Sequence, residues 1–149
     1  MQLLLRGLLI GVLLFGMMPS PMAQEVAQSP PGSAPGITIE LNKLEQTGSA
    51  CRSYFVVNNG AVDSLKELRL AVYLFDRTGV ILRSVALTFS DVRASRSKVV
   101  MFDIPEVPCN NLSRLVVNDI TTCASASGAP LPACSSIATR TRTEAEFIY

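Results

Sequence analysis

The sequence predicts an all-β fold, an antiparallel β-sandwich of about six or seven strands. Apolar side chains recur at every second position rather than at the spacing of a helix. Turn-forming residues separate these alternating segments roughly every ten to fifteen residues, and no segment has a convincing long-helix pattern. Because the chain of 149 residues has the length of one domain, we expect a single sandwich.

Six segments carry the strand pattern. The first, ITIELNKL, alternates Ile37, Ile39 and Leu41 with polar residues. The sequences NNG at 58–60 and DRTG at 76–79 end two of the segments with residues that form tight turns. The predicted strands cover residues 37–44, 51–57, 66–75, 80–89, 98–104 and 114–121.

Alternation also predicts which side chains face the core. A helix at 64–75 is the main alternative for one element, but the strict alternation from Leu68 to Leu74 favours a strand. Arg83 interrupts the apolar face of the fourth segment. The predicted inward-facing residues are Phe55, Val57, Leu68, Leu70, Val72, Leu74, Ile81, Val85, Leu87, Phe89, Val100, Phe102 and Ile104.

The first 23 residues have the pattern of a secretory signal peptide. Arg6 precedes an apolar run, and prolines and the small residue Ala23 follow it. A retained membrane anchor is the alternative, but the run of about 12 residues is shorter than the roughly 18–20 that cross a bilayer. Residues 24–36 are rich in proline and glycine and are expected to be a disordered leader.

The composition excludes several classes of site. The chain has no histidine, so a histidine-based triad and a histidine-containing zinc site are impossible within it. Its 13 Lys and Arg against 12 Asp and Glu do not suggest nucleic acid as a partner. We predict no cofactor, no metal, and no integral membrane segment once the signal is removed.

Four cysteines in an exported chain favour disulfides. Cys109 and Cys123 are separated by an extended segment, so they are too far apart to be bridged. If each strand reverses the previous one, Cys51 and Cys109 lie at one end of the sandwich and Cys123 at the other. We therefore predict the pairs Cys51–Cys109 and Cys123–Cys134. A metal or redox site is the alternative, but the closely spaced cysteines that such sites need are absent.

The RASRSK sequence at 93–98 is the densest basic stretch. A polar turn between two strands is the simplest interpretation, and contact of Arg93, Arg96 and Lys98 with an anionic partner is the functional hypothesis. Enzymatic alternatives are carboxylate pairs for acid–base chemistry and a Ser–Lys dyad. Their candidate residues are Asp63 with Glu67, Asp103 with Glu106, and Lys66 or Lys98.

The C-terminal segment is the hardest to assign. The alternation indicates a β-sandwich domain at 37–123, followed at 124–149 by a loop and a C-terminal strand or tail. Three large apolar residues, Phe147, Ile148 and Tyr149, favour an edge strand that docks on the sandwich, and a frayed tail is the alternative.

The segment LKELRLAVYLFDRTGVILRS, after VVNNG, resembles the FxLYD-type immunoglobulin-like domain of secreted bacterial proteins. The resemblance covers roughly residues 50–105 and implies an immunoglobulin-like sandwich. The segments LNKLEQTGSACR and FDIPEVPCNNLSRLVVNDITTC are similar to uncharacterised periplasmic proteins of alphaproteobacteria. Neither resemblance implies an activity or any catalytic residue.

We predict a periplasmic or secreted protein that is not an enzyme but a binding or accessory module. Its partner is expected to be another envelope protein or polymer, bound through loops or an exposed strand edge. The alternatives are a thiol- or carboxylate-dependent enzyme and a structural envelope component recruited through the C-terminal FIY sequence.

Overall fold

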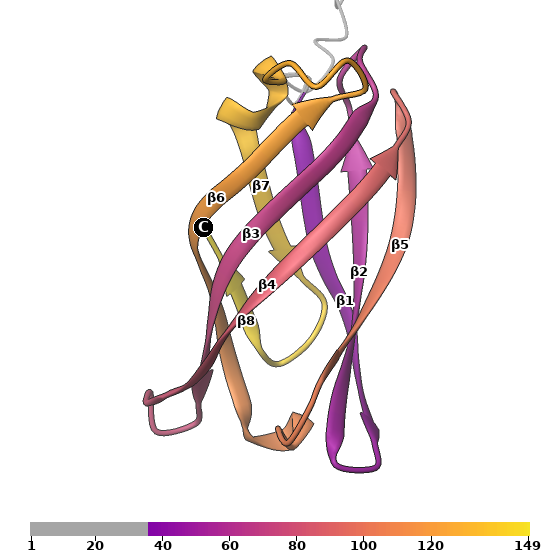
Figure 1. Cartoon of the computed structure of the whole chain (residues 1–149). Coiled ribbons are helices and arrows are strands. Elements are labelled where there is room, and N and C mark those ends of the chain that lie inside the picture. The colour runs from indigo at the N-terminus through magenta and orange to yellow at the C-terminus, as the bar shows by residue number, and fades with distance from the viewer. Residues whose placement is uncertain (1–35) are drawn as a thin grey trace, which may run out of the picture. The chain divides into compact units, whose positions relative to one another are not determined.

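The computed structural model describes residues 36–149. The predicted signal peptide and residues 24–35 of the predicted leader lie outside this range. The described part contains eight strands and two short 3-10 turns, η1 and η2 (Figure 1). None of its helices is long and apolar enough to cross a membrane. The strands are β1 (Ile37–Thr47), β2 (Ala50–Asn59), β3 (Leu65–Asp76), β4 (Ile81–Val92), β5 (Arg96–Ile104), β6 (Leu112–Ser125), β7 (Ile137–Thr141) and β8 (Glu146–Ile148), with η1 at Cys109–Asn111 and η2 at Pro132–Ser136.

Two four-stranded sheets form the predicted β-sandwich. One sheet has the order β5-β2-β1-β7 and the other the order β4-β3-β6-β8. The six predicted strands correspond to β1 through β6, and the segment that contains the leucine repeat is a strand, not a helix. The placement of β1, β2 and β5 in one sheet and of β3, β4 and β6 in the other matches the A, B, E and C, C′, F strands of immunoglobulin-like sandwiches.

The C-terminal segment completes both sheets. β7 joins the first sheet in parallel with β1, and β8 joins the second in parallel with β6. The sandwich therefore extends past residue 123 to Ile148, and two of its strand pairs are parallel rather than antiparallel. Phe147 is 3% exposed, as expected for a docked edge strand. Ile148 and Tyr149 remain exposed.

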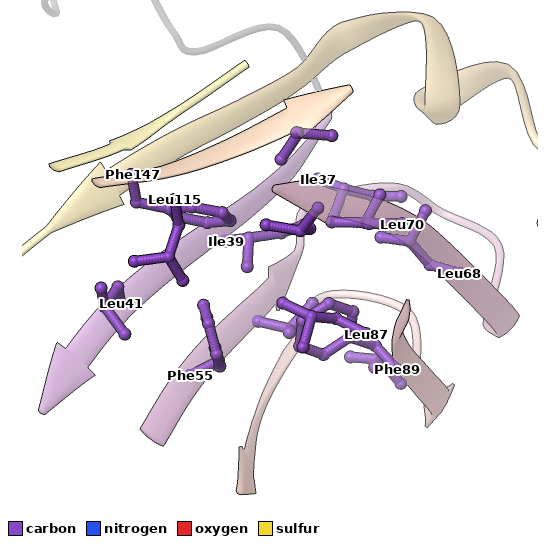
Figure 2. Close-up of a cluster of buried hydrophobic side chains, with 14 of the residues drawn as sticks. Ile37, Ile39, Leu41, Phe55, Leu68, Leu70, Leu87, Phe89, Leu115 and Phe147 are labelled. Atoms are coloured by element: carbon purple, nitrogen blue, oxygen red, sulfur yellow. The ribbon is translucent and has the colours of Figure 1, made fainter. Parts of the chain in front are cut away.

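The core lies between the inner faces of the two sheets. β3 contributes every second residue from Leu68 to Leu74, and each of these side chains is fully buried. β1 contributes Ile37, Ile39 and Leu41 in the same way. All of these side chains belong to one buried cluster. Figure 2 shows part of it, with side chains of β1 and β3 gathered together with Phe55, Leu87, Phe89, Leu115 and Phe147. Period-two alternation thus produces two apolar faces that bury each other.

The first half of β4 departs from the prediction. Ile81 was expected to face the core, but it is 52% exposed, and Val85 is only half-buried. The pairing with β3 shifts register here: Leu74 pairs with Arg83, but Phe75 pairs with Ile81, so Leu82 is the extra residue of a bulge. Ile81 therefore lies opposite Phe75 rather than on the core-facing side of Leu74, and the partly buried Leu82 packs against the core. The Arg83 side chain instead donates a hydrogen bond to the Pro105 carbonyl, 2.8 Å away.

The hairpin itself is formed by the predicted DRTG turn. The Asp76 carboxylate accepts hydrogen bonds from the backbone N–H groups of Thr78 at 2.8 Å and Val80 at 2.9 Å. Gly79 has a φ of +84°, which few other residues tolerate. The hydrogen bond from the Thr78 side chain is the main cause that lowers the pKa of Asp76, so this carboxylate is ionised at neutral pH.

Two disulfides join the cysteines in the pairs that strand parity predicts. Cys51 bonds to Cys109 with Cα atoms 4.9 Å apart, and Cys123 bonds to Cys134 with Cα atoms 6.1 Å apart. The first ties the start of β2 to η1, and the second ties β6 to η2. They lie at opposite ends of the strands, and no cysteine of the described chain remains free.

Candidate anion-binding turn

The predicted basic residues lie in the connection between β4 and β5, which contains Arg93, and at the start of β5, which contains Arg96 and Lys98; residues 93–98 are called the basic turn. β4 ends at Val92 and β5 begins at Arg96, so the chain crosses from one sheet to the other in three residues. Asp91 and Ser95 have φ values of 53° and 52°, which non-glycine residues seldom adopt. Asp91 thus bends the backbone just before the basic turn, and Ser95 bends it within the turn, directly before β5 begins.

The β2–β3 loop fixes the backbone of the basic turn. The N–H of Ser95 donates to the Ala61 carbonyl at 3.2 Å, and the N–H of Ala94 donates to the Ser64 hydroxyl at 3.3 Å. These bonds link two loops that are about thirty residues apart in sequence. The turn is therefore held in place before any partner binds.

Asn59 is the centre of this anchor. It is fully buried, and its side-chain N–H groups donate to the carbonyls of Asp63 at 2.9 Å and Val92 at 3.1 Å. Its side-chain oxygen accepts a hydrogen bond from the N–H of Ala61 at 3.1 Å. One buried amide thus joins the end of β2, the β2–β3 loop and the end of β4.

Replacing Asn59 with alanine is expected to lower the free energy of unfolding by about 2 kcal/mol, because it leaves buried backbone groups without partners. Urea denaturation measures the change, and Asn118→Ala, at an exposed position of β6, is the matched control. A cost as small as that of the control would contradict the anchoring role.

A hollow of about 460 Å³ opens beside the basic turn. Its lining residues are Asp91, Val92, Arg93, Arg96, Ser97 and Lys98. The ammonium of Lys98 donates a hydrogen bond to the Ser90 carbonyl on β4, 2.6 Å away. Within residues 36–149, neither Arg93 nor Arg96 forms an ion pair with a carboxylate. The structure therefore brings all three predicted cations to one exposed hollow and leaves two of them without a charged partner.

Asp91 is the acidic residue of the hollow. It pairs with Lys66 on β3, with the ammonium nitrogen 2.7 Å from the carboxylate oxygen. This hydrogen bond is the largest cause that lowers the pKa of Asp91. Because Lys66 balances the charge of Asp91, the positive charges of the turn remain available. Guanidinium groups in such a position bind carboxylates or phosphates through paired hydrogen bonds.

A second hollow of about 450 Å³ lies beside the β7–β8 connection and also contains cations, Lys43, Arg77 and Arg142. Each of them pairs with a glutamate of the chain, at distances of 3.1, 3.3 and 2.8 Å respectively. Their charges are already balanced, so this hollow is the weaker candidate for binding an anion.

The predicted carboxylate and Ser–Lys alternatives gain little from the structure. Asp103 accepts two hydrogen bonds from Arg52, at 2.7 and 2.9 Å, and this partner lowers the pKa of Asp103. A carboxyl group held ionised in this way is a poor general acid. Hydrogen bonding to Asp91 raises the pKa of Lys66, which opposes the neutral form that a dyad base requires.

The sequence reasoning missed the anchor and part of the surface. Asn59 was assigned only to a turn, and a buried asparagine cannot be distinguished from a turn asparagine by pattern alone. The two most exposed apolar side chains of β5, Val99 at 60% and Met101 at 57%, were also not singled out. Their alternation with Val100 and Phe102 places them on the outer face, which is the signal that was available.

Comparison with known proteins supports the fold only. No family model matches the chain, and no curated protein matches it in sequence. The chain is similar to the solved structure of IrmA from Escherichia coli, with a TM-score of 0.51 and 20% sequence identity over 70% of this chain and 90% of that one. The comparisons therefore support the β-sandwich and do not assign the chain to a family. The chain is a disulfide-stabilised β-sandwich that shares the fold of IrmA.

Proposed function

We propose that the protein is a non-catalytic binding module of the periplasm or the cell exterior that contacts an anionic partner through the basic turn. The observation that carries this proposal is the pair Arg93 and Arg96, exposed beside one hollow on a backbone anchored by Asn59. A fixed backbone lowers the entropy lost on binding, since the turn need not become ordered.

The disulfides support both the compartment and the absence of thiol chemistry. Disulfides persist in oxidising compartments, which include the periplasm and the cell exterior. A thiol-dependent enzyme requires a thiolate, and all four cysteines are bonded in pairs. The partner is another envelope protein or polymer with acidic groups, and nothing in the near-neutral charge of the chain favours nucleic acid.

Recruitment through the C-terminal FIY sequence receives less support as an alternative. Phe147 is buried in the core and contacts the ring of Phe55 at a centroid distance of 5.4 Å. Deleting residues 147–149 would therefore damage the fold, and loss of localisation in that variant would not identify a recruitment motif.

Retention of the mature protein on immobilised polyglutamate tests the proposal. We expect retention in 20 mM NaCl that falls steeply in 200 mM NaCl, because solvent-exposed charges are screened by salt. The Arg93→Ala/Arg96→Ala variant should elute several-fold earlier in the gradient. Arg69→Ala/Arg140→Ala removes the same charge from exposed positions elsewhere and should elute close to the parent protein. Equal losses in the two variants would contradict a site at the basic turn.

A further inference from the structure

β5 forms a long, regular and open edge of its sheet. The sheet order places β5 at one end, paired only with β2. The register between them is continuous from Cys51 opposite Ile104 to Asn59 opposite Arg96, with no bulge. The other side of a strand in this position presents backbone N–H and C=O groups that have no strand partner.

The other three edges of the sandwich are less suited to pairing. β7 has five residues and β8 has three. β4 is longer, but its register with β3 shifts near the hairpin, and Asp91 takes a positive φ near its other end. Among the described strands, β5 therefore offers the longest regular edge, nine residues.

The usual protections of an edge strand are missing or already engaged on β5. No proline occurs in residues 96–104. Lys98 is a typical guard residue, but its ammonium is already engaged by the Ser90 carbonyl of β4 in the other sheet. Val99 and Met101 instead expose large apolar side chains on the outer face of the strand. An open edge of this kind accepts an extended peptide as an additional strand.

Charge indicates the direction and the chemistry of such a peptide. Antiparallel pairing is the more stable arrangement, and it places the C-terminal end of an added strand beside Arg96, where β5 begins. Arg93 and Arg96 lie at that end without ion-pair partners in the described chain. Acidic residues at the C-terminal end of the added segment would meet these guanidinium groups, and alternate apolar residues would lie next to Val99 and Met101.

We propose that the partner binds through an extended segment that adds an antiparallel strand to β5, with alternating apolar side chains and acidic residues at its C-terminal end. This inference rests on the proposed function, because the basic turn supplies the contacts to the acidic residues. Backbone hydrogen bonds provide the pairing, and the position of the charges selects its orientation.

The test uses the mature protein and a synthetic peptide of about nine residues that alternates threonine and valine and ends in Asp-Glu, with binding measured by calorimetry. Only alternate residues of an added strand direct their N–H groups towards β5. N-methylation of one alternating set of peptide nitrogens should therefore weaken binding at least tenfold, and methylation of the other set should leave it nearly unchanged. A peptide with the acidic residues moved to the N-terminus should bind several-fold more weakly.

Variants of the protein locate the surface. Val99→Ser/Met101→Ser should weaken binding several-fold, whereas Val80→Ser/Ile81→Ser, which removes similarly exposed apolar side chains from the β3–β4 hairpin, should not. Amide hydrogen exchange should show new protection at alternate residues of β5 when the peptide is bound, and no new protection on β4 or β7. This pattern would distinguish strand addition from contact with the basic turn alone.

The outcomes separate this inference from the proposed function. Strand addition would be overturned if both methylated peptides bound equally well. It would also be overturned if no peptide bound while retention on polyglutamate still depended on Arg93 and Arg96, and the anionic contact would then stand. Loss of both signals would overturn both proposals. Protection of the β5 amides from hydrogen exchange in the free protein, together with a concentration-dependent dimer, would show that a second copy of the chain pairs with this edge. That result would overturn the proposal that a partner peptide binds there.

Discussion

Replacing Phe55 with alanine is expected to lower the free energy of unfolding by about 3–5 kcal/mol. The Phe55 side chain is fully buried, and its ring contacts three others edge to face. The centroid distances are 5.7 Å to Phe89, 5.8 Å to Phe102 and 5.4 Å to Phe147. Because these rings come from strands of both sheets, truncation leaves a cavity where the two layers meet.

Urea denaturation of the oxidised protein measures this change. Tyr149→Ala is the control, since it removes an aromatic ring that is 62% exposed, and it should cost no more than about 0.5 kcal/mol. Phe55→Leu keeps most of the side-chain volume and should fall between the two. A loss below about 1 kcal/mol in Phe55→Ala would mean that the aromatic cluster does not hold the layers together.

Removing the disulfide between Cys51 and Cys109 in the double alanine variant is expected to cost about 4 kcal/mol. The bond spans 58 residues of sequence, so breaking it restores much conformational freedom to the unfolded chain. The corresponding variant of Cys123 and Cys134 spans only 11 residues and should cost about 3 kcal/mol.

The order of these two losses is the informative result, because both variants replace two cysteines by two alanines. Urea denaturation under identical conditions gives both values. A larger cost for the shorter loop would show that local packing, rather than the entropy of the unfolded chain, dominates the contribution of the disulfides. Cys51 is fully buried, so its replacement also removes a packed side chain and adds to the expected difference.

Much of the fold could be predicted because the alternation of apolar and polar residues within each strand shows which side chains face the core. The alternation from Leu68 to Leu74 is a local pattern, and the structure buries every residue of that set. The cysteine pairs could likewise be predicted by counting how often the chain reverses direction between two cysteines, because that number decides whether they lie at the same end of the sandwich. Ile81 shows the limit of such reasoning: alternation gives the face of a residue only as far as the register stays regular, and the bulge at Leu82 reverses the pattern.

The C-terminal strands were harder to predict because they are held by pairing with strands distant in sequence, and not by a pattern in their own residues. The TRTRT sequence at 139–143 is polar, and β7 pairs with β1 through backbone groups that any residue carries. The basic turn was visible as charge density, but its anchoring depends on Asn59, which lies more than thirty residues earlier in the chain. Such long-range hydrogen bonds leave no periodic signal in a single sequence.

Each disulfide joins a cysteine to the next cysteine in chain order, the first with the second and the third with the fourth. Under the proposed export, with the N-terminal end emerging first, an oxidase would find the correct partner already present when the second and the fourth cysteine emerge. Maturation should then require an oxidant but little isomerase activity, since no early bond has to be reshuffled to reach the native connectivity.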